Sequence, residues 1–123
     1  MADAKEPTPG PGHPIEQQAR EQTGQREIRL QIDERNLRTN YSNFFVANAT
    51  AEEVMMDFGT IRVLPSGKPD ETPSGVFQAN DRVIMNYYAA KRLAINLSQL
   101  IRRHEEQFGE LELDVAKRMK KGK

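Results

Sequence analysis

The residues from Tyr41 to Val63 constrain the fold most, because they have the pattern of two strands joined by a tight turn. Apolar side chains occur on both alternating sets of the first strand, Phe45, Ala47 and Ala49 against Phe44, Val46 and Asn48. The second strand repeats this, with Val54, Met56 and Phe58 against Met55, Asp57 and Gly59. Alternation at period two places each set on one face of a sheet. Both faces therefore carry large apolar groups, which one helix in a small domain cannot cover.

Two further strands are predicted around this hairpin. Residues 27–33 alternate apolar Ile28, Leu30 and Ile32 with polar neighbours and predict a strand that precedes the hairpin. Residues 76–85 predict a last strand with one apolar face, and Asn80-Asp81 interrupts its alternation. We place Phe77, Ala79, Val83 and Met85 on that face.

The connections carry their own signals. Thr50 to Glu53 predicts the hairpin turn, although Thr50 followed by Glu53 also resembles the capping box of a short helix. Gly59 inside a strand predicts a bulge or a close backbone approach. The proline- and glycine-rich residues 64–75 predict a flexible loop, either a tolerated insertion or a lid.

A long helix is predicted from Asn86 to Phe108, which contain neither proline nor glycine. Apolar side chains recur at spacings of three and four, and charged residues occupy the other positions. Asn86 is suited to cap the start, and Gly109 is suited to end the helix in a left-handed conformation.

The predicted fold class is α+β, with a four-stranded antiparallel sheet followed by one long C-terminal helix packed on it. Residues 1–26 hold four prolines and three glycines and predict a disordered tail. Residues 27–113 form the single domain, and residues 114–123 form a basic tail with five basic and one acidic side chain.

Composition excludes several functional classes. The 18 basic and 18 acidic side chains balance, which argues against a dominant field for nucleic acid or membranes. The chain has no cysteine, so disulfides and thiolate metal sites are excluded, and a reducing cytoplasm fits this composition. No segment reaches the roughly 20 apolar residues of a membrane helix, and no secretory signal is recognised. We therefore expect a cytoplasmic protein.

Geometry predicts self-association. A four-stranded sheet is about 14 Å wide between its outer axes and a helix is about 10 Å across, so one helix shields part of one face. Phe44, Val46 and Met55 on the other face would remain exposed to solvent, and exposed apolar patches of this kind usually mark an interface. We expect a homo-oligomer, a dimer or a tetramer. The alternative is that the 64–75 loop, residues 34–40 or the C-terminal leucines cover this surface.

Residues 27–111 resemble an uncharacterised bacterial family, domain of unknown function 3467. The most recognisable parts are Arg38-Thr39-Asn40-Tyr41-Ser42-Asn43 and Asp57-Phe58-Gly59. The N-terminal tail and the 64–75 loop lie outside this resemblance. The family implies no reaction. The predicted order of four strands and a helix also looks like the export chaperone SecB, which binds unfolded polypeptide, although no SecB motif is present.

The sequence offers few catalytic candidates. His104 lies on the apolar side of the predicted helix and could act as a base, but a packed edge histidine is the commoner arrangement. Asp57 is better explained by a structural ion pair with Arg62 or Arg38 than by catalysis. The two histidines do not form a metal pair, because His13 lies in the predicted tail. We expect no catalytic residue, no metal site and no cofactor.

Two functions remain open at this point. The first is a non-enzymatic binding protein that holds a protein partner or an unfolded client, in a chaperone- or adaptor-like way. Its interface would include Phe44, Val46 and Met55, with Arg38, Asn40, Tyr41 and Asn43 as a polar neighbour. The alternative is a nucleic-acid-associated regulator that uses residues 38–43 and the basic tail, since asparagine and arginine can read base edges. The same residue types also satisfy backbone groups in ordinary loops.

Overall fold

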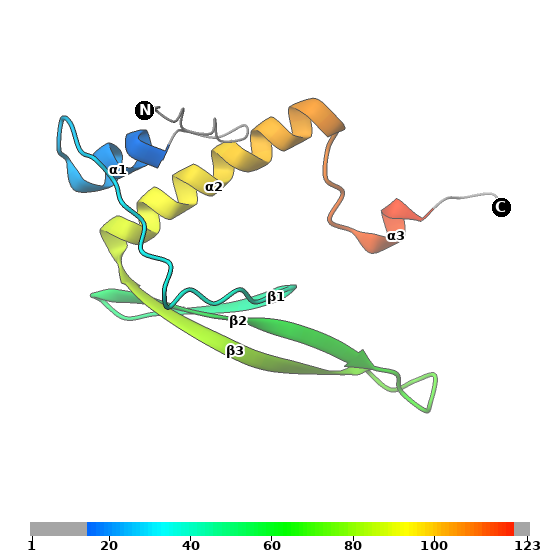
Figure 1. The fold of residues 1–123 in the computed structure, drawn as a ribbon. Helices are drawn as coiled ribbons and strands as arrows, with labels where there is room; N and C mark the ends of the chain where they lie inside the picture. The colour runs from blue at the N-terminus through cyan, green and yellow to red at the C-terminus, as the bar shows by residue number, and fades with distance from the viewer. Residues whose placement is uncertain (1–14, 120–123) are drawn as a thin grey trace. The chain divides into compact units, whose positions relative to one another are not determined.

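The computed structural model describes residues 15–119 and contains six elements in chain order. A helix, α1 (Ile15–Thr23), precedes three strands, β1 (Phe44–Ala49), β2 (Glu53–Leu64) and β3 (Ser74–Asn86). Two helices follow, α2 (Tyr87–Phe108) and α3 (Val115–Arg118) (Figure 1). Residues 31–91 form one compact unit that contains the sheet. The described residues 15–30 and 92–119 belong to a second unit.

The three strands form an antiparallel meander in the order β1-β2-β3, and its β1–β2 pair is the predicted hairpin. The predicted turn at Thr50 is confirmed. The Thr50 amide donates to the Glu53 carbonyl over 2.9 Å, and the Thr50 hydroxyl accepts hydrogen bonds from the amides of Glu52 and Glu53. These hydrogen bonds pair the backbone groups of a four-residue turn, which leads into β2 and not into a helix.

The strand register divides the apolar side chains between two faces. We call them the Phe45 face, which comprises Phe45, Ala47, Ala49, Val54, Met56, Phe58, Val83 and Met85, and the Phe44 face, which comprises Phe44, Val46, Met55, Ile61, Val63, Phe77 and Ile84. The alternation predicted for β1 and β2 is confirmed by this register. The sheet is therefore apolar on both sides.

A β-bulge interrupts β3 opposite Gly59, as predicted. Phe58 pairs with Asp81 and Gly59 pairs with Ala79, so Asn80 is the extra residue. A Cβ atom on Gly59 would overlap the Gln78 carbonyl oxygen, which explains why glycine is required there. The bulge corrects one prediction: Phe77 and Ala79 lie on the face opposite to Val83 and Met85, because the extra residue reverses the alternation.

The strand predicted over residues 27–33 is not formed, and across residues 15–119 the sheet has three strands rather than the predicted four. These residues have the alternating pattern of a strand, but a strand also needs a neighbouring backbone with which to form hydrogen bonds. Just after this segment the chain makes a turn, in which the Leu37 amide donates to the Glu34 carbonyl. The exposed Asp33 carboxylate accepts from the Arg35 amide and guanidinium at the start of this turn.

The long helix agrees with its prediction. β3 passes into α2 without a linker, and the Asn86 side chain accepts a hydrogen bond from the Ala89 amide over 2.8 Å. Gly109 ends the helix with a φ of 96°, and its amide donates to the Glu105 carbonyl. The Tyr87 hydroxyl donates to the Thr50 carbonyl over 2.6 Å, which attaches the first residue of α2 to the β1–β2 turn.

Helix α1 occupies part of the segment for which we predicted disorder. Its mean composition is polar, but Gln17 donates to Glu21 one turn later, and the Thr23 hydroxyl donates to the Ala19 carbonyl. Gly24 ends it with a φ of 78°. Residues 1–14 of the predicted tail lie outside the described residues. At the other end, Asp114 caps α3 by accepting from the Ala116 amide, within the predicted basic tail.

Candidate interaction surface on the sheet

The Ser42-Asn43 pair binds the backbone of β2 beside the bulge. The Gly59 amide donates to the Ser42 hydroxyl over 3.1 Å, and the Asn43 amide donates to the Gly59 carbonyl over 3.0 Å. The Asn43 side-chain oxygen accepts from the Ile61 amide over 2.9 Å. Side chains thus replace ladder hydrogen bonds where β1 has not yet begun. The two most recognisable sequence segments, 38–43 and 57–59, meet here for a structural reason.

Asn40 connects the same segment to β3. Its amide donates to the Asp81 carboxylate over 2.9 Å, 41 residues away in the sequence. Asn40, Asp81, Ser42, Phe58 and their neighbours line an open hollow of about 570 Å³, to which Asn36, Leu37, Arg38 and Val83 also contribute. Segment 36–42 therefore lies along the Phe45 face, which Phe58, Asp81 and Val83 share.

The predicted polar residues divide into two groups. Asn40 and Asn43 have side chains engaged in hydrogen bonds within the unit. Arg38 and Tyr41 are exposed, and Tyr41 is 73% exposed. Arg38 and Tyr41 are therefore available for a partner, whereas the two asparagines are committed to holding the segment in place.

Asp57 forms an ion pair on the Phe44 face, as predicted, but its partner is Arg82 rather than Arg62 or Arg38. Arg82 donates two hydrogen bonds to the carboxylate, over 2.7 and 3.0 Å, and the two residues are directly opposite in the strand register. The hydrogen bond from Arg82 lowers the pKa of Asp57 and raises that of Arg82. This geometry keeps Asp57 ionised and occupied, which favours a structural role over that of a base.

The predicted apolar residues Phe44, Val46 and Met55 are brought together on one face of the sheet. Phe44 contacts Phe77 edge to face, with ring centroids 5.3 Å apart. Phe44 and Val46 nevertheless remain 39% and 37% exposed, and Met55 is half-buried. On the opposite face, Phe45 is 59% exposed. Within the described chain, Ala19 is the one buried apolar residue, so no side chain of the sheet forms a closed core.

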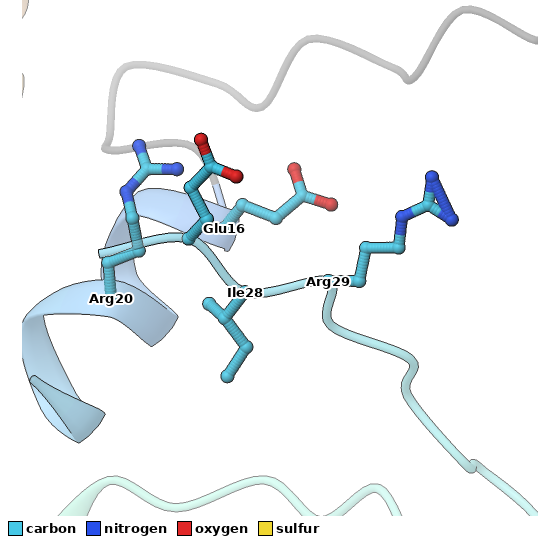
Figure 2. A pocket seen from close by; sticks show the side chains of 5 residues that line it. Glu16, Arg20, Ile28 and Arg29 are labelled. Atoms are coloured by element: carbon cyan, nitrogen blue, oxygen red, sulfur yellow. The ribbon is translucent and has the colours of Figure 1, made fainter. Parts of the chain in front are cut away.

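The remaining candidates carry no site chemistry. His104 is exposed and its ring lies 4.9 Å from that of Phe108. Among residues 15–119 no three histidine or acidic side chains gather as metal ligands would. An open hollow of about 540 Å³ beside α1 is lined by Glu16, Arg20, Glu27, Ile28 and Arg29. Figure 2 shows these lining side chains. Its two acidic and two basic residues balance, so it offers no net charge to a ligand.

Sequence reasoning missed two contacts of this surface. These are the Asn40–Asp81 hydrogen bond and the ion pair between Asp57 and Arg82. Both depend on the register of β3, which a single sequence does not give. The signal for that register was the interruption at Asn80-Asp81, because it marked the bulge.

No helix between residues 15 and 119 combines the length and apolarity needed to cross a membrane.

Comparison with known proteins gives a family and no activity. No curated protein and no solved structure matches the chain significantly. The model of the family described as "Protein of unknown function (DUF3467)" matches residues 1–113, which include both the N-terminal segment and the 64–75 loop that we placed outside the resemblance. Because this match covers most of its length, the chain belongs to the DUF3467 family.

Proposed function

We propose that this chain is a non-enzymatic binding protein of the cytoplasm that assembles with copies of itself through its sheet. The apolar surface that remains after assembly would hold a protein partner or an unfolded client. The single observation that carries this proposal is the exposure of large apolar side chains on both faces of one small sheet.

The dimensions of the sheet and of a helix indicate that one helix cannot cover both apolar faces of the sheet. Three strands are about 10 Å wide between their outer axes, and a helix is about 10 Å across. An amphipathic helix such as α2 can therefore shield one face at most. Phe44 and Phe45 lie on opposite faces and are both substantially exposed, so one face would remain in water whichever face a helix covered. Contiguous apolar surfaces of several hundred Å² usually mark interaction sites.

The chemistry of the surface suits a protein more than a nucleic acid. Met55, Met56 and Met85 add flexible side chains to the phenylalanines, and methionine adapts to partners of varied shape. Base reading would need free amide groups, but the Asn40 and Asn43 side chains are hydrogen-bonded to Asp81 and to the β2 backbone. The nucleic-acid alternative therefore depends on Arg38 and on the basic tail, part of which lies outside the described residues.

Light scattering coupled to size-exclusion chromatography tests the assembly. We expect a dimer or tetramer at micromolar concentrations, and a chain that stays monomeric would contradict the proposal. Phe45→Glu should shift the equilibrium toward smaller species. Leu113→Glu is the matched control, because Leu113 is 88% exposed and lies outside the sheet, so this change should leave the mass unaltered.

Two further measurements separate the classes of partner. The assembled protein should suppress aggregation of a chemically denatured model client, and no effect at several-fold molar excess would remove the client-holding function. Fluorescence anisotropy with single-stranded and double-stranded DNA and RNA at moderate salt should show no binding. Binding that disappears when residues 114–123 are deleted would favour the nucleic-acid alternative instead.

A further inference from the structure

The hollow beside segment 36–42, which we call the Arg38 hollow, has walls from two parts of the chain that are distant in sequence. Segment 36–42 forms one wall, and Phe58 of β2 with Asp81 and Val83 of β3 forms the other. Its volume is about 570 Å³. All of its lining residues belong to residues 31–91, so the Arg38 hollow lies within one compact unit.

Hydrogen bonds hold the wall formed by segment 36–42 in place. The Asn40 amide donates to the Asp81 carboxylate over 2.9 Å, which joins this wall to β3. At the end of the segment, the Ser42 hydroxyl accepts from the Gly59 amide over 3.1 Å, which joins it to β2. A concave surface that is formed in advance loses less conformational freedom when a ligand binds. The Arg38 hollow is therefore suited to receive part of a partner molecule.

Apolar side chains make up much of the surface that a ligand would contact. Val83 is 42% exposed, Leu37 is exposed and Phe58 is half-buried. Covering such side chains with an apolar group removes their surface from water, which is favourable. A hollow of this volume has room for more than one side chain, so a short peptide segment fits it better than a single apolar group.

The charges of the Arg38 hollow favour an acidic ligand. Its carboxylate, that of Asp81, already accepts a hydrogen bond from Asn40. Its cation, Arg38, is exposed and takes part in no ion pair within residues 15–119. An arginine side chain binds a carboxylate through two parallel hydrogen bonds, which fix the orientation of the bound group. Arg38 is therefore complementary to an acidic side chain that lies beside an apolar one.

We infer that the Arg38 hollow binds an extended segment of a protein partner in which large apolar side chains are flanked by acidic ones. The apolar side chains contact Phe58 and Val83, and a flanking carboxylate contacts Arg38. This inference rests on the proposed binding function and adds the class of sequence that is held. Segments with basic flanks are disfavoured, because they bring a second cation close to Arg38.

Two short fluorescein-labelled peptides test the charge preference. Both have leucine and phenylalanine at the centre, flanked by glutamates in one peptide and by lysines in the other. Fluorescence anisotropy is measured with the unmodified full chain at the same salt concentration. We expect the glutamate peptide to bind about fivefold more tightly than the lysine peptide, as one exposed ion pair allows. A glutamate peptide with serines at the centre should bind more weakly than the original.

Variants at Arg38 assign the preference to this side chain. Arg38→Gln should weaken binding of the glutamate peptide about fivefold, and Arg38→Glu should make the lysine peptide the tighter ligand. Arg62→Gln is the matched control, because Arg62 lies on β2 beyond the bulge and outside the Arg38 hollow, and it should leave both affinities unchanged.

Variants on β3 assign the apolar contact. Val83→Thr replaces a methyl group by a hydroxyl of similar size and should weaken binding of the glutamate peptide about fourfold. Val76→Thr is the same change in the same strand, at a residue that is 46% exposed and does not line the Arg38 hollow. This control should bind the peptide like the unmodified chain.

Three results would overturn the inference. Equal affinity for the glutamate and lysine peptides, or an unchanged preference in Arg38→Glu, would remove the acidic segment as the ligand. Equal losses for Val83→Thr and Val76→Thr would remove the Arg38 hollow as the contact surface. No binding of either peptide would remove the site, including a hollow that self-association closes. The proposed function fails separately: a chain that assembles and suppresses client aggregation without this peptide preference retains it.

Discussion

Replacing Gly59 by alanine should be among the most damaging single changes in this sheet. The added Cβ atom would overlap the Gln78 carbonyl oxygen and lie 2.9 Å from the Gln78 carbonyl carbon. Ordinary van der Waals contacts begin near 3.4 Å, so the two strands would have to separate by about 1 Å at the bulge.

The magnitude follows from what such a separation loses. One or two ladder hydrogen bonds beside the bulge would lengthen, at about 1 kcal/mol each. Overpacking of a closely packed site typically adds about 1–3 kcal/mol. We therefore expect the free energy of unfolding to fall by about 2–5 kcal/mol. Gly75→Ala is the control, because its Cβ would meet Ile61 Cδ1 at an ordinary distance of 3.7 Å.

Urea denaturation followed by far-UV circular dichroism measures both variants. Protein concentration must be the same for all samples, because self-association would couple stability to concentration. The Gly75→Ala variant should stay within about 0.5 kcal/mol of the unmodified chain, as expected where no structural feature is lost. The bulge explanation would be refuted if the Gly59→Ala and Gly75→Ala variants had the same unfolding midpoint.

Three further changes test other contacts. Ser42→Ala removes the hydroxyl that accepts from the Gly59 amide and should cost about 1–2 kcal/mol of unfolding free energy in the same assay; Ser98→Ala on α2 should cost nothing measurable. Asp57→Asn removes a carboxylate whose folded pKa is lowered, so the ion pair stabilises fully above the unfolded pKa of about 3.9 and is lost as pH falls through the lowered value. The unmodified chain should therefore lose more stability between pH 6 and pH 3 than Asp57→Asn, and equal slopes would contradict the ion pair. Asn86→Ala removes the α2 cap and should cost about 1 kcal/mol, seen as a lower thermal midpoint by circular dichroism; an unchanged midpoint would show that the cap does not contribute.

The elements that could be predicted are those whose signals are local. The period of α2, its asparagine cap and its terminal Gly109 are all contained in consecutive residues. The hairpin turn at Thr50 and the bulge at Gly59 follow from residue types whose backbone requirements are specific. Local signals were misleading where the outcome depends on a distant neighbour. Residues 27–33 have the alternation of a strand, but alternation does not report whether another backbone is present.

Helix α1 and the polar contacts of the surface show the same limit. α1 has few apolar residues, so its sequence lacks the periodic apolar pattern of a packed helix. The prolines before it favoured a prediction of disorder, although Gly24 is a suitable residue to end a helix. The pairing of Asp57 with Arg82 required the strand register, whereas Arg62 was nearer in sequence. For the candidate site, the sequence placed Phe44 and Val46 on a shared exposed face, which the register confirms. It did not distinguish the asparagines that hold segment 38–43 from the side chains left available for a partner.

The extra residue at the bulge gives the long hairpin two amphipathic halves of opposite orientation. In the half nearer the β1–β2 turn, the more apolar face is the one that carries Met56, Phe58 and Val83. In the half beyond Asn80, the more apolar face is the opposite one, which carries Ile61 and Phe77. A partner that packs on one face of the sheet would cover the more apolar surface of one half and leave that of the other half exposed to water. A partner that covered both halves would therefore have to contact opposite faces of the hairpin at its two ends.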